Sequence, residues 1–224
     1  MIIFEPSILS ADLANLGDQV RQVQDAGGTI VQVDVMDGQF VPNLTFGAMV
    51  IRALRPLVHL KLDAHLMIVE PERFIDEFAA SGADRIIVHQ ETCPLLKETL
   101  QHIRSLGVEA GVTLNPETPL ATIADVLSHA DVVQVMTVHP GFGGQKFLEN
   151  QLPRIRQLRS MLAEQGLTIP IAVDGGIDER TAPLVVKAGA TILIAGSSVF
   201  NAKRSVAANL AALNASVAGI TNKP

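Results

Sequence analysis

Residues 12 to 35 read DLANLGDQVRQVQDAGGTIVQVDV and place a helical pattern directly before a strand pattern. Over residues 12 to 26, apolar side chains recur at helical spacing on one face, at Leu13, Leu16, Val20 and Val23. Gly27 and Gly28 then end the predicted helix, because glycine readily takes the left-handed conformation that closes a helix. Residues 29 to 35 are rich in β-branched side chains and predict a strand. The stretch is therefore one helix-to-strand unit.

Similar units recur along the chain. Short β-branched runs predict eight strands, at residues 2–8, 29–35, 60–66, 85–90, 109–115, 132–138, 170–176 and 191–197. Their starts lie about 20 to 40 residues apart, which matches a strand, a crossover helix and two short loops. The short segments DAGG, ASGAD and KAGAT precede the second, fourth and eighth runs. Their weak similarity to one another is what a repeated unit would leave.

Helix signals fill the gaps between these runs. Pro71 suits the first turn of a helix predicted over residues 71–80, which ends before Ser81 and Gly82. Asp178 suits the N-cap of a helix predicted over residues 178–188, which ends before Gly189. The alternation continues without a linker, a charge block or a low-complexity segment.

Eight consecutive strand-and-helix units, with strands apolar on both faces, predict an α/β fold that is a single (β/α)8 TIM barrel over residues 1–224. The alternative is a doubly wound open sheet. That fold would normally carry a GxGxxG turn after the first strand, where this chain has PSILSAD.

Composition predicts a soluble globular protein, because hydrophobic residues make up 48% of the 224 residues and charged residues 18%. The net charge of −6 argues against a nucleic-acid partner but leaves room for small anionic ligands held by backbone amides. The single cysteine, Cys93, is interpreted as a loop or helix-start thiol. With no apolar leader and no apolar run near ~20 residues, we expect a cytoplasmic protein that does not enter a membrane.

In a barrel, functional residues gather at the C-terminal ends of the strands. Those ends carry polar or flexible residues in all eight runs: Ser7, Asp34 with Met36, His65 with Met67, His89 with Glu91, Asn115, Met136 with His139, Asp174, and Gly196 with Ser197. This concentration predicts an active site there.

Two of the carboxylates follow directly from apolar strand patterns. Asp34 and Asp174 each come directly after buried apolar strand residues. A buried carboxylate needs either a hydrogen-bonding or ionic partner or a functional role. Two carboxylates from different strands can flank one carbon, one taking a proton and the other returning one. Asp37, which precedes Gly38, is interpreted as an ordinary turn residue.

His65 lies two residues after Asp63, so the two side chains share one face of their strand. Beside two carboxylates, His65 becomes a candidate ligand for Zn, Mn or Fe. His89 and Glu91 could form a similar pair, and we give them a supporting role.

Glycine-rich turns follow the last three strands, at GFGG (141–144), GG (175–176) and GS (196–197). Glycine lets a ligand approach the backbone closely, and barrels often bind phosphate in this quarter. Three methionines just beyond strand ends, Met36, Met67 and Met136, would line the mouth of the site with water-excluding surface.

Six motifs together resemble the ribulose-phosphate 3-epimerase family. They are PSILSAD (6–12), DVMDGQFVPN (34–43), DAHLMI (63–68), VMTVHPGFGGQKF (135–147), VDGGI (173–177) and AGSSVF (195–200). The resemblance covers the chain from Pro6 to about Phe200. It implies an isomerase of the pentose phosphate pathway that interconverts D-ribulose 5-phosphate and D-xylulose 5-phosphate.

The resemblance also implies roles for individual residues. Asp34 and Asp174 would be the acid/base pair at C3 of the sugar, and both would bind one divalent metal ion (Zn, Fe or Mn) together with His65, which also faces the substrate. Ser7 would contact the substrate, and the three methionines would cap it. The implied phosphate-side residues are Gly141, Phe142, Gly143, Gly144, Gly175, Gly176, Gly196 and Ser197.

Two positions depart from the family's pattern. Gln32 stands where the family has a histidine ligand, so an amide replaces the fourth implied metal ligand. His139 stands where the family commonly carries Asn, Glu or Asp. Two alternatives therefore stay open beside the pentulose epimerase: a 3-epimerase of a six-carbon ketose phosphate such as allulose 6-phosphate, and a non-catalytic sugar-phosphate-binding barrel. The resemblance also allows for a homo-oligomer.

Overall fold

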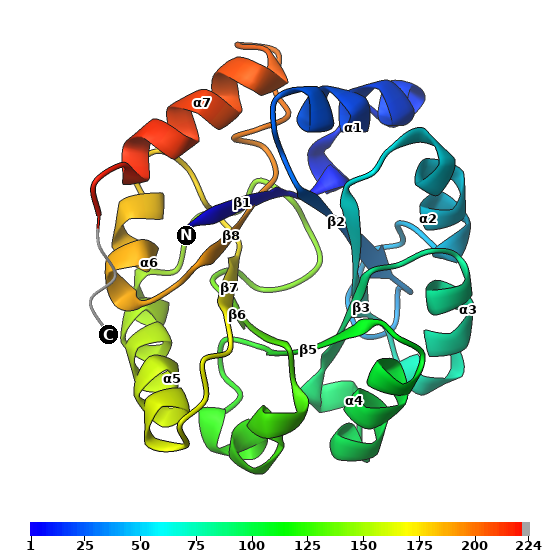
Figure 1. Cartoon of the computed structure of the whole chain (residues 1–224), viewed down its shortest axis with the longest axis vertical. Coiled ribbons are helices and arrows are strands. Elements are labelled where there is room, and N and C mark those ends of the chain that lie inside the picture. Colours follow the sequence, from blue (N-terminus) through cyan, green and yellow to red (C-terminus); the bar gives the residue numbers. More distant parts are fainter. Residues whose placement is uncertain (221–224) are drawn as a thin grey trace.

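The β-branched runs all form strands of one parallel sheet, which curls into a ring (Figure 1). The computed structural model describes residues 1–220. Its strands are β1 (Ile3–Pro6), β2 (Ile30–Met36), β3 (Lys61–Met67), β4 (Arg85–His89), β5 (Glu109–Leu114), β6 (Val132–Met136), β7 (Ile171–Asp174) and β8 (Ile192–Ala195). Neighbours pair in the order β1-β8-β7-β6-β5-β4-β3-β2, and a parallel bridge between Ser7 and Gln32 joins β1 to β2. The predicted (β/α)8 barrel is confirmed.

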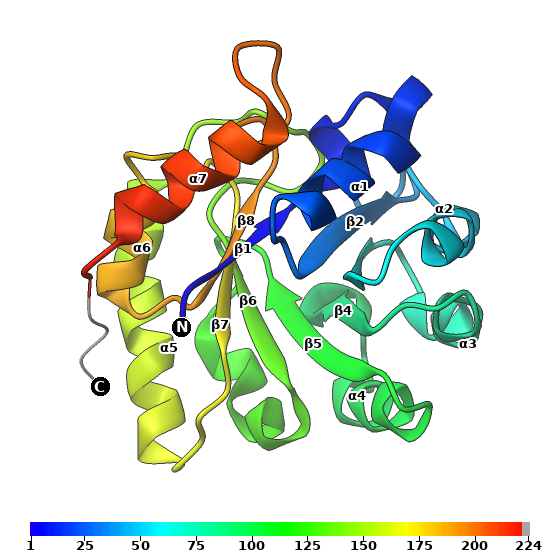
Figure 2. The ribbon, with the colours of Figure 1, turned by 45° about the horizontal axis from the view of Figure 1, so that its top comes forward.

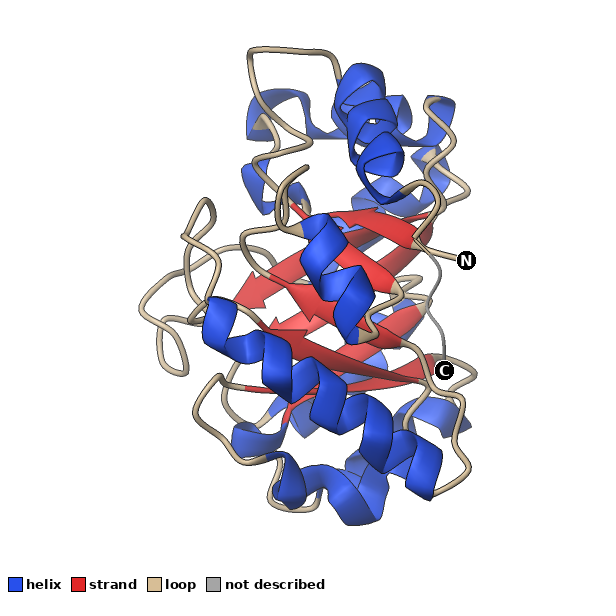
Figure 3. Ribbon diagram, turned by 90° about the vertical axis from the view of Figure 1, so that its left-hand side faces the viewer, coloured by secondary structure: helices blue, strands red, loops and turns tan. Residues whose placement is uncertain are grey.

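Helices surround the sheet (Figure 3). They are α1 (Leu16–Asp25), α2 (Ala48–Leu54), α3 (Ile75–Ala80), α4 (Leu96–Ser105), α5 (Leu152–Glu164), α6 (Ala182–Ala188) and α7 (Val206–Val217). Between β5 and β6 the connection is a 3-10 helix, Leu120–His129. Figure 2 shows α5 and α6 on one side of the sheet and α2, α3 and α4 on the other. Within residues 1–220, no helix combines the length and apolarity needed to cross a membrane.

The first predicted helix is shorter than its pattern. Asp12 caps a 3-10 turn, Leu13–Asn15, and α1 begins only at Leu16. Val20 and Val23 are fully buried, as the pattern predicts, but Leu13 is 60% exposed because it lies before the helix and not on its buried face. The expectation for Leu13 was therefore wrong.

The helices predicted at residues 71–80 and 178–188 also begin later than expected. Pro71 opens a 3-10 turn that precedes α3. The Asp178 carboxylate accepts the backbone N–H groups of Arg180 and Thr181, so it caps the turn that leads into α6 and not the α-helix itself. Gly189, at φ 116°, ends α6 as predicted.

Every strand is buried on two faces. On β2, Val31, Val33 and Val35 pack outward in the main hydrophobic core, which the helices complete. Alternate residues point into the barrel, where Ile87, Val132, Ala172, Ile192 and Ile194 form a second apolar cluster. A continuous apolar outer layer and a mixed interior explain why the runs read as buried strands.

An ionic cluster occupies the N-terminal end of the barrel interior. Arg85 Nη1 lies 3.1 Å from Asp63 Oδ2 and 3.4 Å from Glu5 Oε2, and Arg85 Nη2 lies 2.9 Å from Glu109 Oε2. Burial and the charge of Asp63 raise the pKa of Glu5 well above its usual value. Asp63 and His65 do share an inward face, as alternation predicts, but Asp63 serves this ionic cluster instead of the opposite end of the barrel.

Candidate active site

A cavity of about 420 Å³ opens at the C-terminal ends of the strands. Its lining includes most of the residues that the sequence singles out, namely Ser7, Asp34, Met36, Met67, Met136, Gly141, Phe142, Gly143, Gly144, Asp174, Gly175, Gly176, Gly196 and Ser197. These residues come from the first, second, third, sixth, seventh and eighth strands or from the loops that follow them. Parallel strands bring such distant positions to one end of the barrel.

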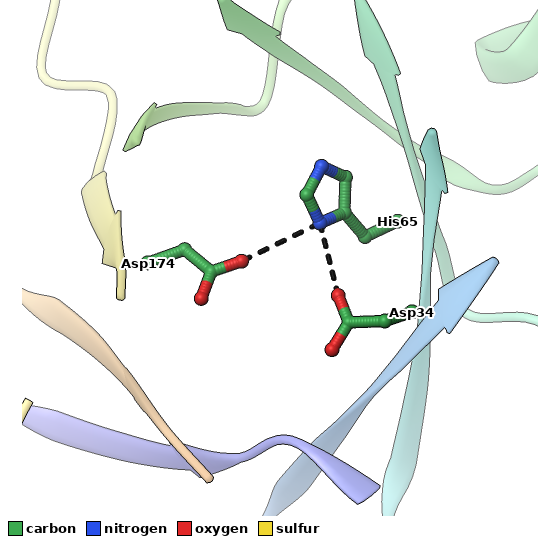
Figure 4. A group of neighbouring side chains, drawn as sticks. All are labelled: Asp34, His65 and Asp174. Atoms are coloured by element: carbon green, nitrogen blue, oxygen red, sulfur yellow. Dashed lines mark hydrogen bonds and ion pairs between the residues drawn. The ribbon is translucent and has the colours of Figure 1, made fainter. Parts of the chain in front are cut away.

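Asp34 and Asp174, which line this cavity, converge with His65 (Figure 4). His65 Nδ1 lies 3.1 Å from Asp34 Oδ1 and 3.4 Å from Asp174 Oδ2. One ligand atom from each of the three residues lies within 4.8 Å of the others. His65 is fully buried beneath the carboxylates and, unlike them, does not line the cavity.

This crowding changes the acidity of the groups. Burial lowers the pKa of His65, but the hydrogen bonds and negative charges of Asp174 and Asp34 outweigh burial and raise the pKa to about 9. Burial and the negative charge of Asp34 raise the pKa of Asp174. A carboxyl group with a raised pKa can hold a proton at a higher pH than usual.

Gln32 bridges the two carboxylates. Its amide nitrogen Nε2 donates to Asp34 Oδ1 at 2.8 Å and to Asp174 Oδ2 at 2.9 Å. Its amide oxygen Oε1 is buried and has no hydrogen-bond partner among residues 1–220. The side chain thus touches the same two carboxylate oxygens that face His65 Nδ1.

Ser7 holds the other oxygen of Asp34. Its hydroxyl donates to Asp34 Oδ2 at 2.5 Å, while Ser7 Oγ accepts the backbone N–H of Leu9. With Oδ1 facing Gln32 and His65, and Oδ2 facing Ser7, the Asp34 carboxylate is held in one orientation.

Gln134 is a site residue that sequence reasoning missed. Its Nε2 lies 3.3 Å from Asp174 Oδ2 and 3.5 Å from Met136 Sδ. Alternation along β6 offered a signal, because Gln134 lies two residues before Met136 and must share its inward face.

The glycine-rich turns form one wall of the cavity. Gly176 has φ +66°, and a Cβ there would lie 2.7 Å from the backbone nitrogen of Phe147. A Cβ on Gly196 would lie 2.6 Å from Ser10 Oγ. Only glycine fits at position 176, where the neighbour is backbone, whereas at position 196 the Ser10 hydroxyl would have to turn away. Ser10, which also lines the cavity, was not singled out from the sequence.

The three methionines line the cavity as well. Met36, Met67 and Met136 are all buried, and the first two pack with Val41 in a small apolar cluster. Phe142, in the loop that follows β6, also lines the cavity and is 54% exposed. The methionines give this end of the cavity a water-excluding surface.

His89 lies behind His65, at a hydrogen-bonding distance. Its Nε2 lies 2.9 Å from His65 Nε2, and its Nδ1 lies 3.4 Å from Glu91 Oε2. Burial lowers the pKa of His89 to about 4. Glu91 is also partly buried, but hydrogen bonds from His89 and Thr118 lower its pKa to about 2.

Three other residues lie away from this chemistry. Asp37 accepts the backbone N–H groups of Gln39, Phe40 and Val69, which confirms its interpretation as a turn residue. His139 is exposed, lies 3.6 Å from Glu117 and does not line the cavity. Cys93 is buried, and burial raises the pKa of its thiol to about 12.

Asp34, His65 and Asp174 fit a divalent metal ion. Two carboxylates and one imidazole are a donor set that catalytic metal sites use, with the remaining position open to water or substrate. The unpartnered Gln32 Oε1 could supply a further oxygen after a half-turn of its amide.

The known proteins that are similar in sequence to this chain agree on one family. The model of the family described as "Ribulose-phosphate 3 epimerase family" matches residues 3–200. The chain is 51% identical to ribulose-phosphate 3-epimerase of Bacillus subtilis, across 89% of this chain and 93% of the relative. It is 52% identical to the chloroplastic ribulose-5-phosphate-3-epimerase of Arabidopsis thaliana, across 90% of this chain and 73% of the relative.

Solved structures share the barrel at lower identity. The 3-keto-L-gulonate-6-phosphate decarboxylase of Vibrio cholerae superposes with a TM-score of 0.69 at 13% identity, covering 96% of both chains. A 3-hexulose-6-phosphate synthase gives a TM-score of 0.70 at 21% identity, covering 97% of this chain and all of the other. These likenesses bear on the fold alone.

Proposed function

Because this chain belongs to the ribulose-phosphate 3-epimerase family and is a ribulose-phosphate 3-epimerase of the pentose phosphate pathway, we propose that Asp34 and Asp174 are the two residues that move the proton at C3. Its substrate is accordingly a sugar phosphate, D-ribulose 5-phosphate or D-xylulose 5-phosphate. The similarity to ribulose-phosphate 3-epimerases at about 50% identity favours this function over the six-carbon epimerase and over a non-catalytic barrel.

One observation supports the two-base proposal above all. Two carboxylates from β2 and β7 meet at the floor of the cavity, and each reaches the cavity lining. Epimerisation needs a proton taken from one face of C3 and a proton returned to the other face. In one direction of the reaction Asp34 takes the proton and Asp174 returns one. In the reverse direction the two roles exchange.

Ser7 and Gln32 would keep Asp34 oriented for this transfer. Ser7 donates to one oxygen of the carboxylate and Gln32 to the other. An oriented base reacts more readily than a mobile one, because less freedom is lost on reaching the reactive geometry.

Asp34, His65 and Asp174 would hold one divalent metal ion, Zn, Fe or Mn, with Gln32 as an additional oxygen donor. When bound, the ion would supply positive charge near the sugar oxygen that becomes negative as C3 loses its proton. His65 would serve the substrate through this ion, since it is buried below the cavity.

The glycine wall would hold the phosphate. Its residues are Gly141, Phe142, Gly143, Gly144, Gly175, Gly176, Gly196 and Ser197. Backbone N–H groups in such turns bind anions without a cationic side chain. The methionines at the other end would exclude water from the reacting carbons.

The whole chain, residues 1–224, would be one domain, although its last four residues lie outside the described part. A homo-oligomer stays a prediction. A cytoplasmic location also stays a prediction, and the name of the Arabidopsis relative places that protein in the chloroplast.

Solvent exchange tests the proposal. In deuterated water, the protein supplied with Zn, Mn or Fe should wash deuterium into C3 of ribulose 5-phosphate. Asp34→Asn or Asp174→Asn should lower the exchange rate by ~10²-fold or more, the usual contribution of a general base or acid. Exchange at the wild-type rate in either variant would refute the role of that residue. The ratio of kcat/KM for ribulose 5-phosphate and allulose 6-phosphate would measure the preference for five carbons.

A further inference from the structure

Two buried histidines face each other behind the carboxylates. The Nε2 atoms of His65 and His89 lie 2.9 Å apart, the ring planes differ by 17°, and the ring centroids are 5.1 Å apart. Nearly coplanar rings whose nitrogens meet at this distance are joined edge to edge by a hydrogen bond. One nitrogen must donate and the other must accept, so the tautomer of one ring determines the tautomer of the other.

The far side of His89 meets a fixed carboxylate. Its Nδ1 faces Glu91 Oε2 at 3.4 Å. The other carboxylate oxygen, Oε1, accepts the backbone N–H of Asn115 at 2.7 Å and also the hydroxyl of Thr118. Phe40 packs on the His89 ring, with centroids 4.7 Å apart. The carboxylate and the ring are therefore both held in place.

We propose that Glu91 and His89 are positioning residues that keep one proton of His65 on Nε2, so that Nδ1, which faces Asp34 and Asp174, is the nitrogen that gives up its proton when a metal ion binds. This proposal rests on the metal site proposed above. The direction of each hydrogen bond follows from Glu91, which lies at one end of the series Glu91, His89 and His65. An ionised Glu91 only accepts, so His89 carries its proton on Nδ1. His89 Nε2 then accepts from Nε2–H of His65, which leaves Nδ1 of His65 as the nitrogen that can exchange its proton for a cation.

Histidines that bind metals usually donate their second ring nitrogen to an oxygen, which fixes their orientation. Here His89 lies between His65 and the carboxylate of Glu91, so Glu91 sets the tautomer of His89, and His89 in turn sets the tautomer of His65. Gln134 does not decide the tautomer. Its Nε2 lies 3.3 Å from Nδ1 and 3.5 Å from Nε2 of His65, and a position nearly equidistant from both nitrogens is over the ring and away from either in-plane lone pair.

Glu91→Gln should reverse the chain of donors with almost no change in shape. The backbone N–H of Asn115 can only donate, so the amide oxygen of the new side chain must stay beside it. The NH₂ group of the new side chain then faces His89. His89 Nδ1 must then accept, its Nε2 carries the proton, and His65 Nε2 accepts that proton's hydrogen bond. His65 is left with its proton on Nδ1, where a cation would bind.

The control is Glu117→Gln. Glu117 is an exposed carboxylate that also faces a histidine, with Oε1 at 3.6 Å from His139 Nε2, but it has no contact with the His65–His89 pair. Metal-stripped wild-type protein, Glu91→Gln and Glu117→Gln would be titrated with Zn²⁺ and with Mn²⁺ by calorimetry. We expect Glu91→Gln to weaken binding by ~10- to 100-fold, as loss of an outer partner of a metal-binding histidine usually does. Glu117→Gln should bind as the wild type does.

Long-range ¹H–¹⁵N spectra of the imidazole rings separate the tautomer from the simple loss of a negative charge. In zinc-loaded wild-type protein we expect His89 protonated on Nδ1 and His65 on Nε2. In Glu91→Gln we expect His89 protonated on Nε2.

Wild-type affinity in Glu91→Gln, or Nε2 protonation of His89 in the wild-type protein, would overturn the positioning role. If Glu91→Gln fails to fold, the wild-type spectrum alone decides the tautomer. A wild-type protein that binds neither ion would instead overturn the metal site itself.

Discussion

A single amide joins the two proposed acid/base residues: Gln32 Nε2 donates to Asp34 Oδ1 at 2.8 Å and to Asp174 Oδ2 at 2.9 Å. By the resemblance described above, this amide stands where the family has a histidine. It therefore leaves the carboxylate pair intact, and it brings the two carboxylates together through hydrogen bonds. The cost is a buried amide oxygen with no partner in the described chain.

Replacing this amide with imidazole should strengthen metal binding. Gln32→His adds a nitrogen ligand, and borderline ions such as Zn²⁺ prefer imidazole to a neutral amide oxygen. We expect calorimetry to show tighter Zn²⁺ binding than in the wild-type protein, with a smaller gain for Mn²⁺. Gln32→Leu is the matched control, because it removes both the amide oxygen and the amide nitrogen. Equal Zn²⁺ affinity in wild type and Gln32→His would show that Gln32 is either a competent ligand or no ligand at all, and weaker binding by Gln32→Leu would indicate the first.

The barrel and the acid pair could be predicted from the sequence because both depend on local patterns. Each strand is an apolar run, and the fold then brings all strand ends to one place. Asp34 and Asp174 lie near the ends of such runs, and Asp37 precedes glycine as turn residues do. The exact start of α1 could not be predicted, because Leu13 fits the helical spacing but lies in the preceding 3-10 turn.

Contacts between side chains on neighbouring strands could not be predicted from the sequence patterns. His65 pairs in register with Ile87, and this register is what places His89 beside His65. Register depends on packing across the whole barrel, so no single strand reveals it. Gln134 was missed for a related reason: a buried glutamine within an apolar run looks like a strand residue until its neighbours across the barrel are known.

The ionic cluster at the other end of the barrel should contribute to stability. Arg85→Met removes the cation shared by the buried carboxyl groups of Glu5 and Asp63. We expect the free energy of unfolding to fall by about 3 to 5 kcal/mol, the usual cost of leaving a buried partner uncompensated. Urea denaturation would measure it. The control is Arg21→Met, since Arg21 pairs with Asp18 on the surface and such pairs contribute ~1 kcal/mol or less. Similar losses in both variants would rule out a special role for the cluster.

Glu91 should make a pH-dependent contribution to stability. Its partners lower its pKa to about 2 in the folded protein, from an ordinary value of 4.5. A depressed carboxyl pKa stabilises the fold above pH 4.5, and this contribution is lost as the pH falls from 4.5 toward 2. The difference in free energy of unfolding between wild type and Glu91→Gln should therefore shrink over this range. A difference that stays constant with pH would show that the Glu91 pKa is not depressed.

The close approach at Gly176 should matter for phosphate binding beyond its backbone conformation. Gly176 and Gly166 have nearly the same φ, +66° and +68°, but an added Cβ meets the Phe147 backbone at 2.7 Å only in the first case and has nothing within 4 Å in the second. Both alanine variants take on left-handed strain of ~1 to 2 kcal/mol. Only Gly176→Ala also displaces the wall of the cavity, so we expect its KM for ribulose 5-phosphate to rise roughly tenfold, equivalent to ~1.4 kcal/mol of lost binding. Gly166→Ala should lose stability while keeping KM unchanged. An unchanged KM in Gly176→Ala would place the phosphate away from this wall.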